Sequence, residues 1–513
     1  MNKLACELDA LVFGGGAAGL WLLDELHRRS FRTLLIENRA LGAGQTIASQ
    51  GILHGGLKYA LGGLLSGSAQ AVGEMTDLWR NCLAGRAQPD LRGVRILSPC
   101  CYLWRTQALA SMVGLIAARF GLRTPVTKVA PRERPPALAR CPGEILRVDE
   151  QVIDVVSLLS ELAHRHTDRI LIIGDARDVT FTTSKPGHVE TIELRVASPS
   201  PIQGVARPEG RTPPPFYGNS SADSPPDGAT ECQACSPLQA DSSADFRPDG
   251  ATECSQGRSP PARRGTEPLD ASPPQPPPRR GGGSGEPRDA NAEYVQKGTC
   301  RGVQGEVLSL KPRVVIFAAG EGNAELRRRV GLSQEAMQLR PLHMVMVRGP
   351  LPQLFGHCVD GNKTRVTITS VVDTVGRTVW QVGGEIAEKG VQLSSAELVK
   401  FARGELPSVL PSVDFTNTQW ATYRINRAEG LDPRGARPEG PVWRREGSVI
   451  TAWPTKLVLA PRLAEFIVNS LGKPSHAEPI PSLHPTAYSL QSGGRGEGKI
   501  ARPPWETTVE WHD

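Results

Sequence analysis

The hydrophobic pattern is clearest at the start of the chain. The apolar residues 11–13 end abruptly at the three glycines of residues 14–16, which predicts a short buried strand followed by a tight turn. Apolar positions then recur at helical spacing over residues 20–26, and residues 33–37 form a second short apolar run. The pattern therefore predicts a strand, a glycine turn, a helix and a second strand, which is the order that opens a dinucleotide-binding fold.

Further along the chain, the pattern predicts more helices and strands. Helical spacing appears over residues 62–83, 109–120 and 148–164, the last after a short extended piece. Residues 94–104 form an apolar run typical of one strand, and residues 170–181 predict a strand that continues beyond a bend.

The carboxyl-terminal half has a different periodicity. Much of residues 337–420 alternates with a period of two, which predicts an antiparallel sheet, unlike the parallel sheet expected near the amino terminus. A helix is predicted over residues 394–406 and a strand over residues 418–427. Residues 447–472 predict a strand, a turn and an amphipathic helix.

A long block rich in Pro, Gly, Ser and Arg interrupts this pattern between residues 198 and 299. Its nearly identical segments 220–232 and 242–254 carry no apolar positions, so they cannot build a repeat core. We expect the block to be disordered, because it cannot bury enough surface to offset its conformational entropy. The flanking residues 188–196 and 305–326 read as two halves of one hairpin, which makes the block an insertion.

Composition and charge narrow the class of protein. A chain of 513 residues with 39% hydrophobic residues is long enough for two or three domains. The formal net charge of +6 is a mild excess, for which a solvated surface and an anionic substrate or acidic partner are both open explanations. No apolar run is long enough to cross a membrane, and a strand begins almost at the amino terminus. We expect a cytoplasmic protein, with peripheral contact to the inner membrane face left open.

Cysteine spacing and basic residues indicate no further partner. The ten cysteines show no regular framework, which favours a reducing compartment. Cys232 and Cys235 form a CxxC pair, but no second pair stands at zinc-finger distance, so we expect no metal site. The arginines of the insertion lack interleaved aromatic residues, so we expect no nucleic-acid binding.

The glycine turn predicts the chemistry of the amino-terminal domain. Gly14 would allow the tight turn, Gly16 would let the backbone approach a pyrophosphate, and Gly19 would let helix and strand pack closely. The free N–H groups and positive dipole end of the following helix would face the phosphates. Glu37 closes the second strand, where a carboxylate can accept hydrogen bonds from the adenosine ribose.

The next segment indicates which dinucleotide binds. Residues 42–59 are small, polar and glycine-rich, with Ile52, Leu53 and His54 followed by two glycines and Tyr59. This arrangement resembles the flavoprotein family of D-amino-acid oxidase, glycerol-3-phosphate dehydrogenase and L-2-hydroxyglutarate dehydrogenase, in which a segment Ser-x-x-(Leu/Val)-Ile-His-(Gly/Ser)-Gly-x-x-Tyr lies along the flavin. Gln50 stands where those relatives commonly carry serine. The resemblance implies that the cofactor is FAD.

The resemblance also implies a fold class and a domain organisation. We expect an α/β protein with a Rossmann-type FAD-binding domain, an interleaved and mainly antiparallel β substrate domain, and the disordered insertion. The expected FAD-binding domain comprises residues 1–60, 148–197, 300–336 and 442–472. The expected substrate domain comprises residues 61–147 and 337–441, and residues 473–513 are expected to form a tail.

Candidate site residues follow from the motifs and the resemblance together. The residues expected to bind the cofactor are Gly14, Gly16, Ala18, Gly19, Glu37, Gln45, Thr46, Ser49, Gln50, Gly51, His54, Val179, Ala319, Gly320, Lys456 and Leu457. Arg424 is the expected clamp for an anionic substrate, because a guanidinium grips a carboxylate or phosphate in two parallel hydrogen bonds. Lys58 could supply a second cation or be a surface residue. His343 could act as a base or be a satisfied core histidine.

These observations predict an FAD-dependent oxidoreductase that takes a hydride from a small anionic alcohol or 2-hydroxy acid. An amine- or amino-acid-oxidising enzyme on the same scaffold is the nearest alternative. A second alternative is a flavin-containing protein whose basic insertion binds RNA or a partner. The electron acceptor, whether oxygen, quinone or another protein, stays open at this stage.

Overall fold

The structure is a computed structural model that describes residues 4–55, 67–106, 126–195, 307–360, 363–432, 434–475 and 500–513. Three sequence-based expectations lie outside the described residues: the disordered insertion, the helix over residues 109–120, and the role of Lys58. Among the residues that are described, no helix is long and apolar enough to cross a membrane.

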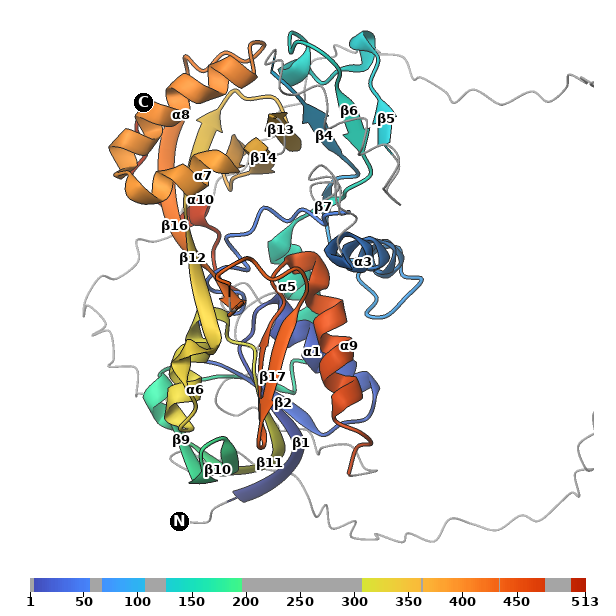
Figure 1. Cartoon of the computed structure of the whole chain (residues 1–513), viewed down its shortest axis with the longest axis vertical. Helices are drawn as coiled ribbons and strands as arrows, with labels where there is room; N and C mark the ends of the chain where they lie inside the picture. The colour runs from blue at the N-terminus through green and yellow to red at the C-terminus, as the bar shows by residue number, and fades with distance from the viewer. Residues whose placement is uncertain are drawn as a thin grey trace, which may run out of the picture. The chain divides into compact units, whose positions relative to one another are not determined.

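The first sheet is built on the predicted strand–turn–helix–strand unit. Its strands follow the order β17-β18-β11-β1-β2-β8, and all neighbouring pairs are parallel except β17 with β18. Its strands are β1 (Leu4–Phe13), β2 (Thr33–Glu37), β8 (Ile170–Ile172), β11 (Val307–Phe317), β17 (Val442–Glu446) and β18 (Val449–Trp453). One face packs against three helices (Figure 1), namely α1 (Ala17–Arg28), α5 (Val155–His164) and α9 (Ala460–Ser470).

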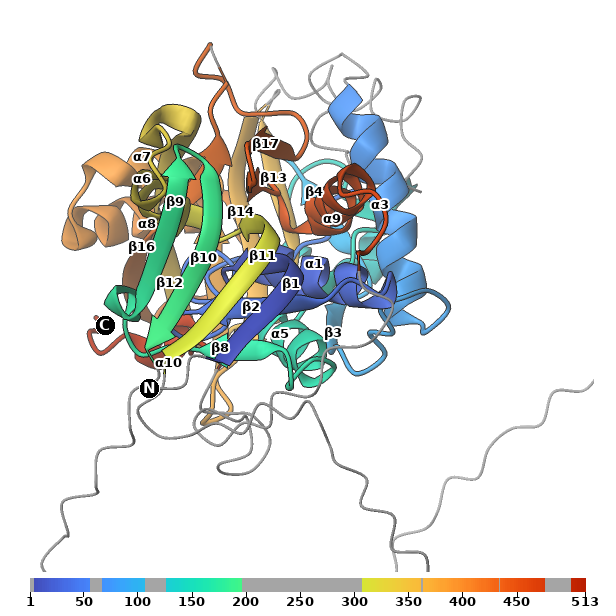
Figure 2. The same cartoon turned by 90° about the horizontal axis from the view of Figure 1, so that it is seen from below.

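A hairpin extends this sheet at β11. Strand β10 (His188–Arg195) pairs antiparallel with β11, with Ile192 opposite Leu310, which confirms that the sequences flanking the insertion form one hairpin. Strand β9 (Val179–Lys185) pairs with β10, and Figure 2 shows β9, β10, β11, β1 and β2 side by side. The expected bent strand over residues 170–181 is therefore two strands, β8 and β9, which occupy opposite ends of the sheet.

The second sheet joins two distant parts of the chain in the order β16-β12-β15-β14-β13-β4-β6-β5. It is antiparallel, as predicted, except where β13 meets β4. Its strands are β4 (Cys101–Trp104), β5 (Val126–Lys128), β6 (Leu146–Val148), β12 (Met337–Gly349), β13 (Gly356–Asp360), β14 (Lys363–Val372), β15 (Thr378–Gly383) and β16 (Gln419–Gly430). We call it the roof sheet. Its outer face packs against α8 (Ser395–Val409), where the predicted helix lies.

One expected strand is interrupted. Residues 94–104 form two strands, β3 (Ile96–Ser98) and β4, and β3 pairs with β7 (Val152–Ile153) in a separate small sheet. Pro99 lies at the interruption and has no backbone N–H to donate, and the Ser98 hydroxyl bonds to the backbone of Cys100 instead. The remaining helices are α3 (Gly67–Leu83), α6 (Asn323–Arg329), α7 (Glu385–Lys389) and α10 (Pro504–Thr507).

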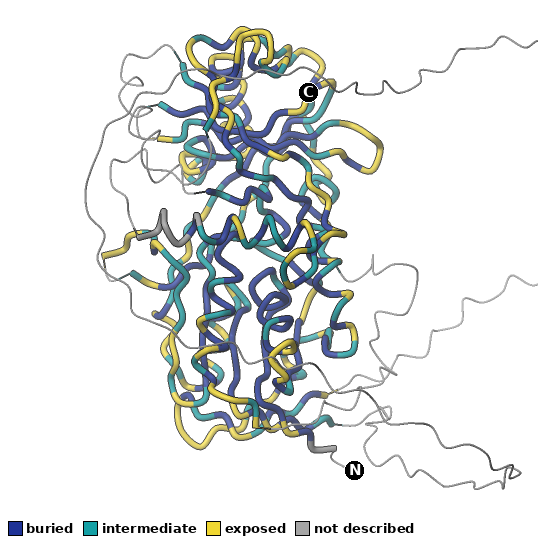
Figure 3. Tube along the Cα trace, turned by 90° about the vertical axis from the view of Figure 1, so that its right-hand side faces the viewer, coloured by how far each residue is buried: buried dark blue, intermediate teal, exposed yellow. Residues whose placement is uncertain are grey.

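The last residues of the chain are packed against both sheets. Ile500 forms a parallel bridge with Leu41, and His512 forms an antiparallel bridge with Trp420 of β16. The Arg348 guanidinium lies 4.0 Å from the centre of the Trp511 ring. The described end of the expected tail is therefore part of the fold. Figure 3 shows the buried residues that run through both sheets.

Asp24 joins α1 to the end of α5. Its fully buried carboxylate receives hydrogen bonds from Arg28 at 2.7 Å, His166 at 3.0 Å and Arg165 at 3.1 Å. Burial raises the pKa of Asp24, but the hydrogen bonds from His166 and Arg28 outweigh it and lower the pKa from 3.8 to about 2. The charged form of Asp24 therefore stabilises the packing of these helices.

We predict that Asp24→Asn lowers the free energy of unfolding by about 2 kcal/mol at pH 7. Because the pKa in the folded state lies below that in the unfolded state, the contribution is complete above about pH 4–5 and is lost as the pH falls toward 2. Urea unfolding of both proteins between pH 3 and 7 checks this, with the exposed Asp77→Asn as the control. A difference that stays constant as the pH falls would contradict the assignment.

Candidate cofactor and active site

Gly14 in the turn after β1 and Gly19 in the first turn of α1 leave no room for side chains. Gly14 adopts a φ of +109°, and a Cβ there would lie 2.5 Å from the Cα of Ala319. A Cβ at Gly19 would lie 1.9 Å from the carbonyl oxygen of Gly14. Gly16 begins α1 without a side-chain cap, and Ala18 lies buried in the first helical turn. This is the close backbone cradle that a pyrophosphate at a helix amino terminus requires.

Glu37 holds this cradle from the end of β2. One carboxylate oxygen accepts a 2.7 Å hydrogen bond from the Gly15 N–H, and the other accepts one of 2.9 Å from the Arg39 N–H. The carboxylate is largely buried and lies beside the glycine turn, where the ribose of a dinucleotide is expected. The glycine turn and Glu37, the acid at the end of β2, thus lie together as the sequence predicts.

A buried asparagine, which the sequence interpretation missed, anchors the end of β11. Asn323 accepts a hydrogen bond from the Ala319 N–H at 2.8 Å and donates one to the Ala452 carbonyl of β18 at 3.1 Å. Gly320 follows with a φ of +59°. This bridge places the predicted Ala319–Gly320 turn next to the end of β18, which leads to Lys456 and Leu457.

The segment of residues 45–55 crosses from the first sheet to the roof sheet, and side-chain hydrogen bonds hold it there. The Gln45 side-chain oxygen accepts a hydrogen bond from the Ala428 N–H at 2.9 Å. The Gln50 amide donates to the backbone carbonyls of Gln381 at 3.0 Å and Thr367 at 3.2 Å. Gln50, which stands in place of the serine of the family motif, therefore has a side chain long enough to reach the roof sheet.

Two further contacts fix the same segment. The Tyr423 hydroxyl donates to the Ala48 carbonyl at 3.1 Å and also lies 3.0 Å from the Gln381 side-chain oxygen. Burial raises the pKa of Tyr423 well above its usual range, so the phenol stays protonated and remains a donor. Gly51 adopts a φ of +67°, and a Cβ there would lie 2.1 Å from the Ile153 carbonyl oxygen.

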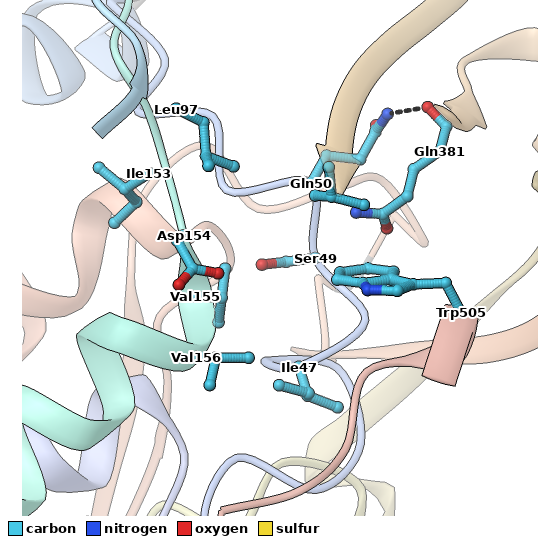
Figure 4. A pocket seen from close by; sticks show the side chains of 11 residues that line it. Ile47, Ser49, Gln50, Leu97, Ile153, Asp154, Val155, Val156, Gln381 and Trp505 are labelled. Carbon is cyan, nitrogen blue, oxygen red and sulfur yellow. Dashed lines mark hydrogen bonds between the residues drawn. The ribbon is translucent and has the colours of Figure 1, made fainter. Parts of the chain in front are cut away.

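A small hollow opens on one side of this segment (Figure 4). The hollow has a volume of about 250 Å³, which includes open solvent. It is lined by residues of the crossing segment, α5, the roof sheet and the end of the chain, among them Ile47, Ser49, Gln50, Asp154, Gln381 and Trp505. The Ser49 hydroxyl is buried and has no hydrogen-bond partner among the described residues. On the side of the first sheet, the Thr46 hydroxyl accepts from the Ala17 N–H at 3.3 Å, next to the cradle.

The remaining predicted cofactor residues lie at the ends of strands. Val179 is buried at the start of β9, and its carbonyl accepts a hydrogen bond from the Arg329 guanidinium. Lys456 and Leu457 follow β18, where Thr455 has a φ of +65° and the Lys456 N–H donates to the Pro454 carbonyl at 2.7 Å.

His343 and Arg424 lie on the outer face of the roof sheet. They are opposite one another in the β12–β16 register, and this face packs against α8 and the residues before it. The His343 ring lies 3.0 Å from the Gly390 carbonyl and 2.9 Å from the Thr422 hydroxyl, and its residue is only 1% exposed. Burial lowers the pKa of His343. Its surroundings therefore favour the core-histidine alternative.

Arg424 is likewise engaged away from the crossing segment. Its guanidinium donates to the carbonyls of Val391 at 3.0 Å and Leu393 at 2.6 Å. The next residue toward the amino terminus, Tyr423, points to the opposite face, because successive side chains of a strand alternate. The structure thus does not bring Arg424 or His343 together with the predicted cofactor residues.

A cluster that the sequence interpretation missed lies at the end of the crossing segment. His54 Nδ1 is 3.4 Å from a carboxylate oxygen of Glu150, and His357 Nε2 is 3.9 Å from the same oxygen. The other Glu150 oxygen accepts a 2.6 Å hydrogen bond from the Gly55 N–H. Glu150 and His357 are 3% and 4% exposed, whereas the His54 side chain is 26% exposed. These residues come from distant parts of the chain, so spacing could not have revealed them.

A second missed cluster is cationic. Arg340 and Arg437 lie 3.8 and 3.2 Å from the two oxygens of the buried Glu429, and Arg427 stands opposite Arg340 in the β12–β16 register. Burial, together with the nearby charge of Arg437, lowers the pKa of Arg427. Arg437 also donates to the Thr455 carbonyl at 3.2 Å. Arg427 lies 3.9 Å from a second carboxylate, that of Glu388 in α7, so three guanidinium groups and two carboxylates gather beside the turn that leads to Lys456.

Together, the parallel sheet with its glycine cradle and the antiparallel roof sheet define the class of two-part FAD-binding oxidoreductases. Residues 9–185 match the model of the family described as FAD dependent oxidoreductase, DAO. The chain is 32% identical over 511 residues to the probable FAD-dependent oxidoreductase PA4991 of Pseudomonas aeruginosa, and the match covers 98% of each chain. The protein therefore belongs to the DAO family of FAD-dependent oxidoreductases.

Solved structures agree with this assignment. The crystal structure of the P. aeruginosa protein matches with a TM-score of 0.63 and 27% identity over 98% of this chain and 99% of that one. L-proline dehydrogenase from P. horikoshii matches with a TM-score of 0.51 over 97% of this chain and all of that one. At 9% identity the second match shows the fold alone. The cofactor is FAD, and the glycine cradle and Glu37 fit its adenosine half.

We predict that Gly16→Val yields protein without FAD. A Cβ at Gly16 would lie 3.0 Å from the Thr46 hydroxyl, and the two further methyl groups of valine would occupy the path of the pyrophosphate. The ratio of flavin absorbance to protein absorbance measures the loss, and circular dichroism monitors the fold. Gly404→Ala is the control, because a Cβ there meets nothing within 4 Å. A fully flavinylated Gly16→Val protein would refute the placement of the pyrophosphate.

Proposed function

We propose that this enzyme oxidises a small anionic alcohol, such as a 2-hydroxy acid. The observation that carries the proposal is the partly exposed His54, with the buried carboxylate of Glu150 behind it, at the end of the crossing segment. FAD accepts the hydride when it is bound. The protein must then bind the anion, orient the carbon–hydrogen bond and accept the hydroxyl proton.

His54 is the proposed proton acceptor, in place of His343. An alcohol loses its hydroxyl proton as the hydride leaves, and an imidazole that titrates near neutral pH suits this transfer. Glu150 lies 3.4 Å from His54 Nδ1, so it can hold the ring in one orientation and stabilise the imidazolium that forms. The Gly55 N–H fixes the other oxygen of this carboxylate.

Arg427 is the proposed clamp for the substrate anion, in place of Arg424. Its neighbour Ala428 bonds to Gln45, and its companion Arg437 bonds to the Thr455 carbonyl, so the cluster adjoins two predicted cofactor segments. Arg340 and Arg437 pair with the buried Glu429, and Arg427 lies 3.9 Å from Glu388, so three arginines face two carboxylates and leave one positive charge in excess for an incoming carboxylate or phosphate. Lys58 stays a proposed second cation.

We also propose a cytoplasmic location, and the cysteines support it. The six cysteines among the described residues are all buried, and no disulfide joins any two of them, as expected for a reducing compartment. The alternative in which the insertion binds RNA or a partner concerns residues outside the described ranges.

We predict that a 2-hydroxy acid bleaches the flavin absorbance under anaerobic conditions. The measurement is a panel of hydroxy acids, phosphorylated alcohols and amino acids, each mixed with the purified holoenzyme. Reduction by an amino acid alone would make the enzyme an amine oxidoreductase on the same scaffold. If no member of any class reduces the flavin, the proposal of a small anionic substrate fails.

We further predict that Arg427→Leu weakens substrate binding by about 2–5 kcal/mol, because removing one partner of a charge-assisted pair leaves the other unpaired. Arg424→Leu is the matched control, since Arg424 lies on the same strand but contacts backbone carbonyls of the outer face. Flavin reduction at varied substrate concentration measures both. If only Arg424→Leu weakens binding, the clamp lies where the sequence first predicted it.

A further inference from the structure

The cluster of His54, Glu150 and His357 contains more titratable groups than a single base requires. One carboxylate oxygen faces two imidazoles, and the two rings lie 5.7 Å apart between centroids at an angle of 31°. A lone histidine beside a buried carboxylate forms a neutral pair once one proton is bound. A second histidine at the same carboxylate gives the cluster a place for a second proton.

Neighbouring residues hold both histidines of the cluster in place. His357 Nδ1 lies 2.9 Å from the Thr367 hydroxyl of β14, so its other ring nitrogen is directed toward Glu150. The Thr76 hydroxyl of α3 donates to the His54 carbonyl at 3.4 Å. The Glu150 side chain contacts His54, Gly55 and His357.

Cys101 and Arg80 are among the described titratable groups near the cluster. Cys101 of β4 is fully buried, and burial, followed by the charge of Glu150, raises the pKa of its thiol, so it stays neutral. Arg80 of α3 donates to the carbonyl of Asp149, next to Glu150 in the chain. Neither group competes with the two imidazoles for a proton near neutral pH.

The cluster is connected to the cofactor through His54. His54 belongs to the segment that the family resemblance places along the flavin, and it is the most exposed member of the three. A negative charge that develops nearby favours the protonated form of a group, and it does so strongly where water is excluded. Reduction of the cofactor would therefore favour the doubly protonated cluster over the singly protonated one.

We propose that His54, Glu150 and His357 form one redox-linked proton site, which holds one proton when the cofactor is oxidised and two when it is reduced. The second proton comes from solvent, or from the substrate when a substrate supplies the electrons. His357 is a positioning residue, because it reaches the reacting groups only through Glu150. The proposal rests on the placement of the flavin along residues 45–55 and is independent of the substrate class.

The test uses the purified holoenzyme and needs no substrate. The midpoint potential of the bound flavin is measured against reference dyes with dithionite as the reductant, from roughly pH 6 to 8, the range in which histidine titrates. The slope of potential against pH gives the protons taken up for each pair of electrons. We expect His357→Gln and Glu150→Gln to take up about one proton fewer than the natural protein.

The controls separate this role from a structural one. The His357→Gln variant retains an amide donor for Glu150 but has no group that titrates at this position. The control variant is His164→Asn, which removes an exposed histidine at the end of α5. A change in the potential that leaves the slope unaltered would overturn the proposal. So would a stoichiometric metal ion in the purified protein, because the imidazoles would then be ligands and not proton carriers. Failure of the substrate panel would leave this result unaffected.

Discussion

The structure depends on the hydrogen bonds that hold the crossing segment of residues 45–55 between its two sheets. Gln45 and Gln50 each place a side-chain amide against the backbone of a roof strand, and Tyr423 returns a hydrogen bond from the roof to Ala48. Amide side chains suit this task because they pair with backbone groups without bringing a charge into the interior. The crossing segment is thereby fixed relative to the roof sheet.

The same geometry explains why neighbouring residues on one strand have different roles. Along β16, Tyr423 contacts the crossing segment, whereas Arg424 bonds to carbonyls on the outer side of the sheet. Side chains of a strand alternate between faces, so moving by one residue changes the surface that a side chain serves. Arg424 therefore contacts the residues that cover the outer face of the roof sheet, whereas Arg427, the proposed clamp, belongs to the opposite face by alternation.

Much of the fold could be predicted from local pattern, because the glycine turn, the helix spacing and the period-two strands each reflect a local constraint. The sequence could not predict which side chains of β12 face which side of the roof sheet. Residues 343–347 are all buried, because both faces of the strand are covered. A strand buried on both sides loses its alternating signal. The cluster of Glu150 and His357 with His54 could not be predicted for another reason, because only the tertiary fold brings these residues together.

We propose that the flavin lies along residues 45–55 and faces the inner side of the roof sheet, where Gln381 and Tyr423 lie. A crystal structure of the FAD-bound enzyme tests it most directly. We expect a flavin ring against the crossing segment, with the imidazole of His54 within reach of the reacting edge and the pyrophosphate at Gly16. A flavin ring beside His343 and Arg424, on the face covered by α8, would contradict it.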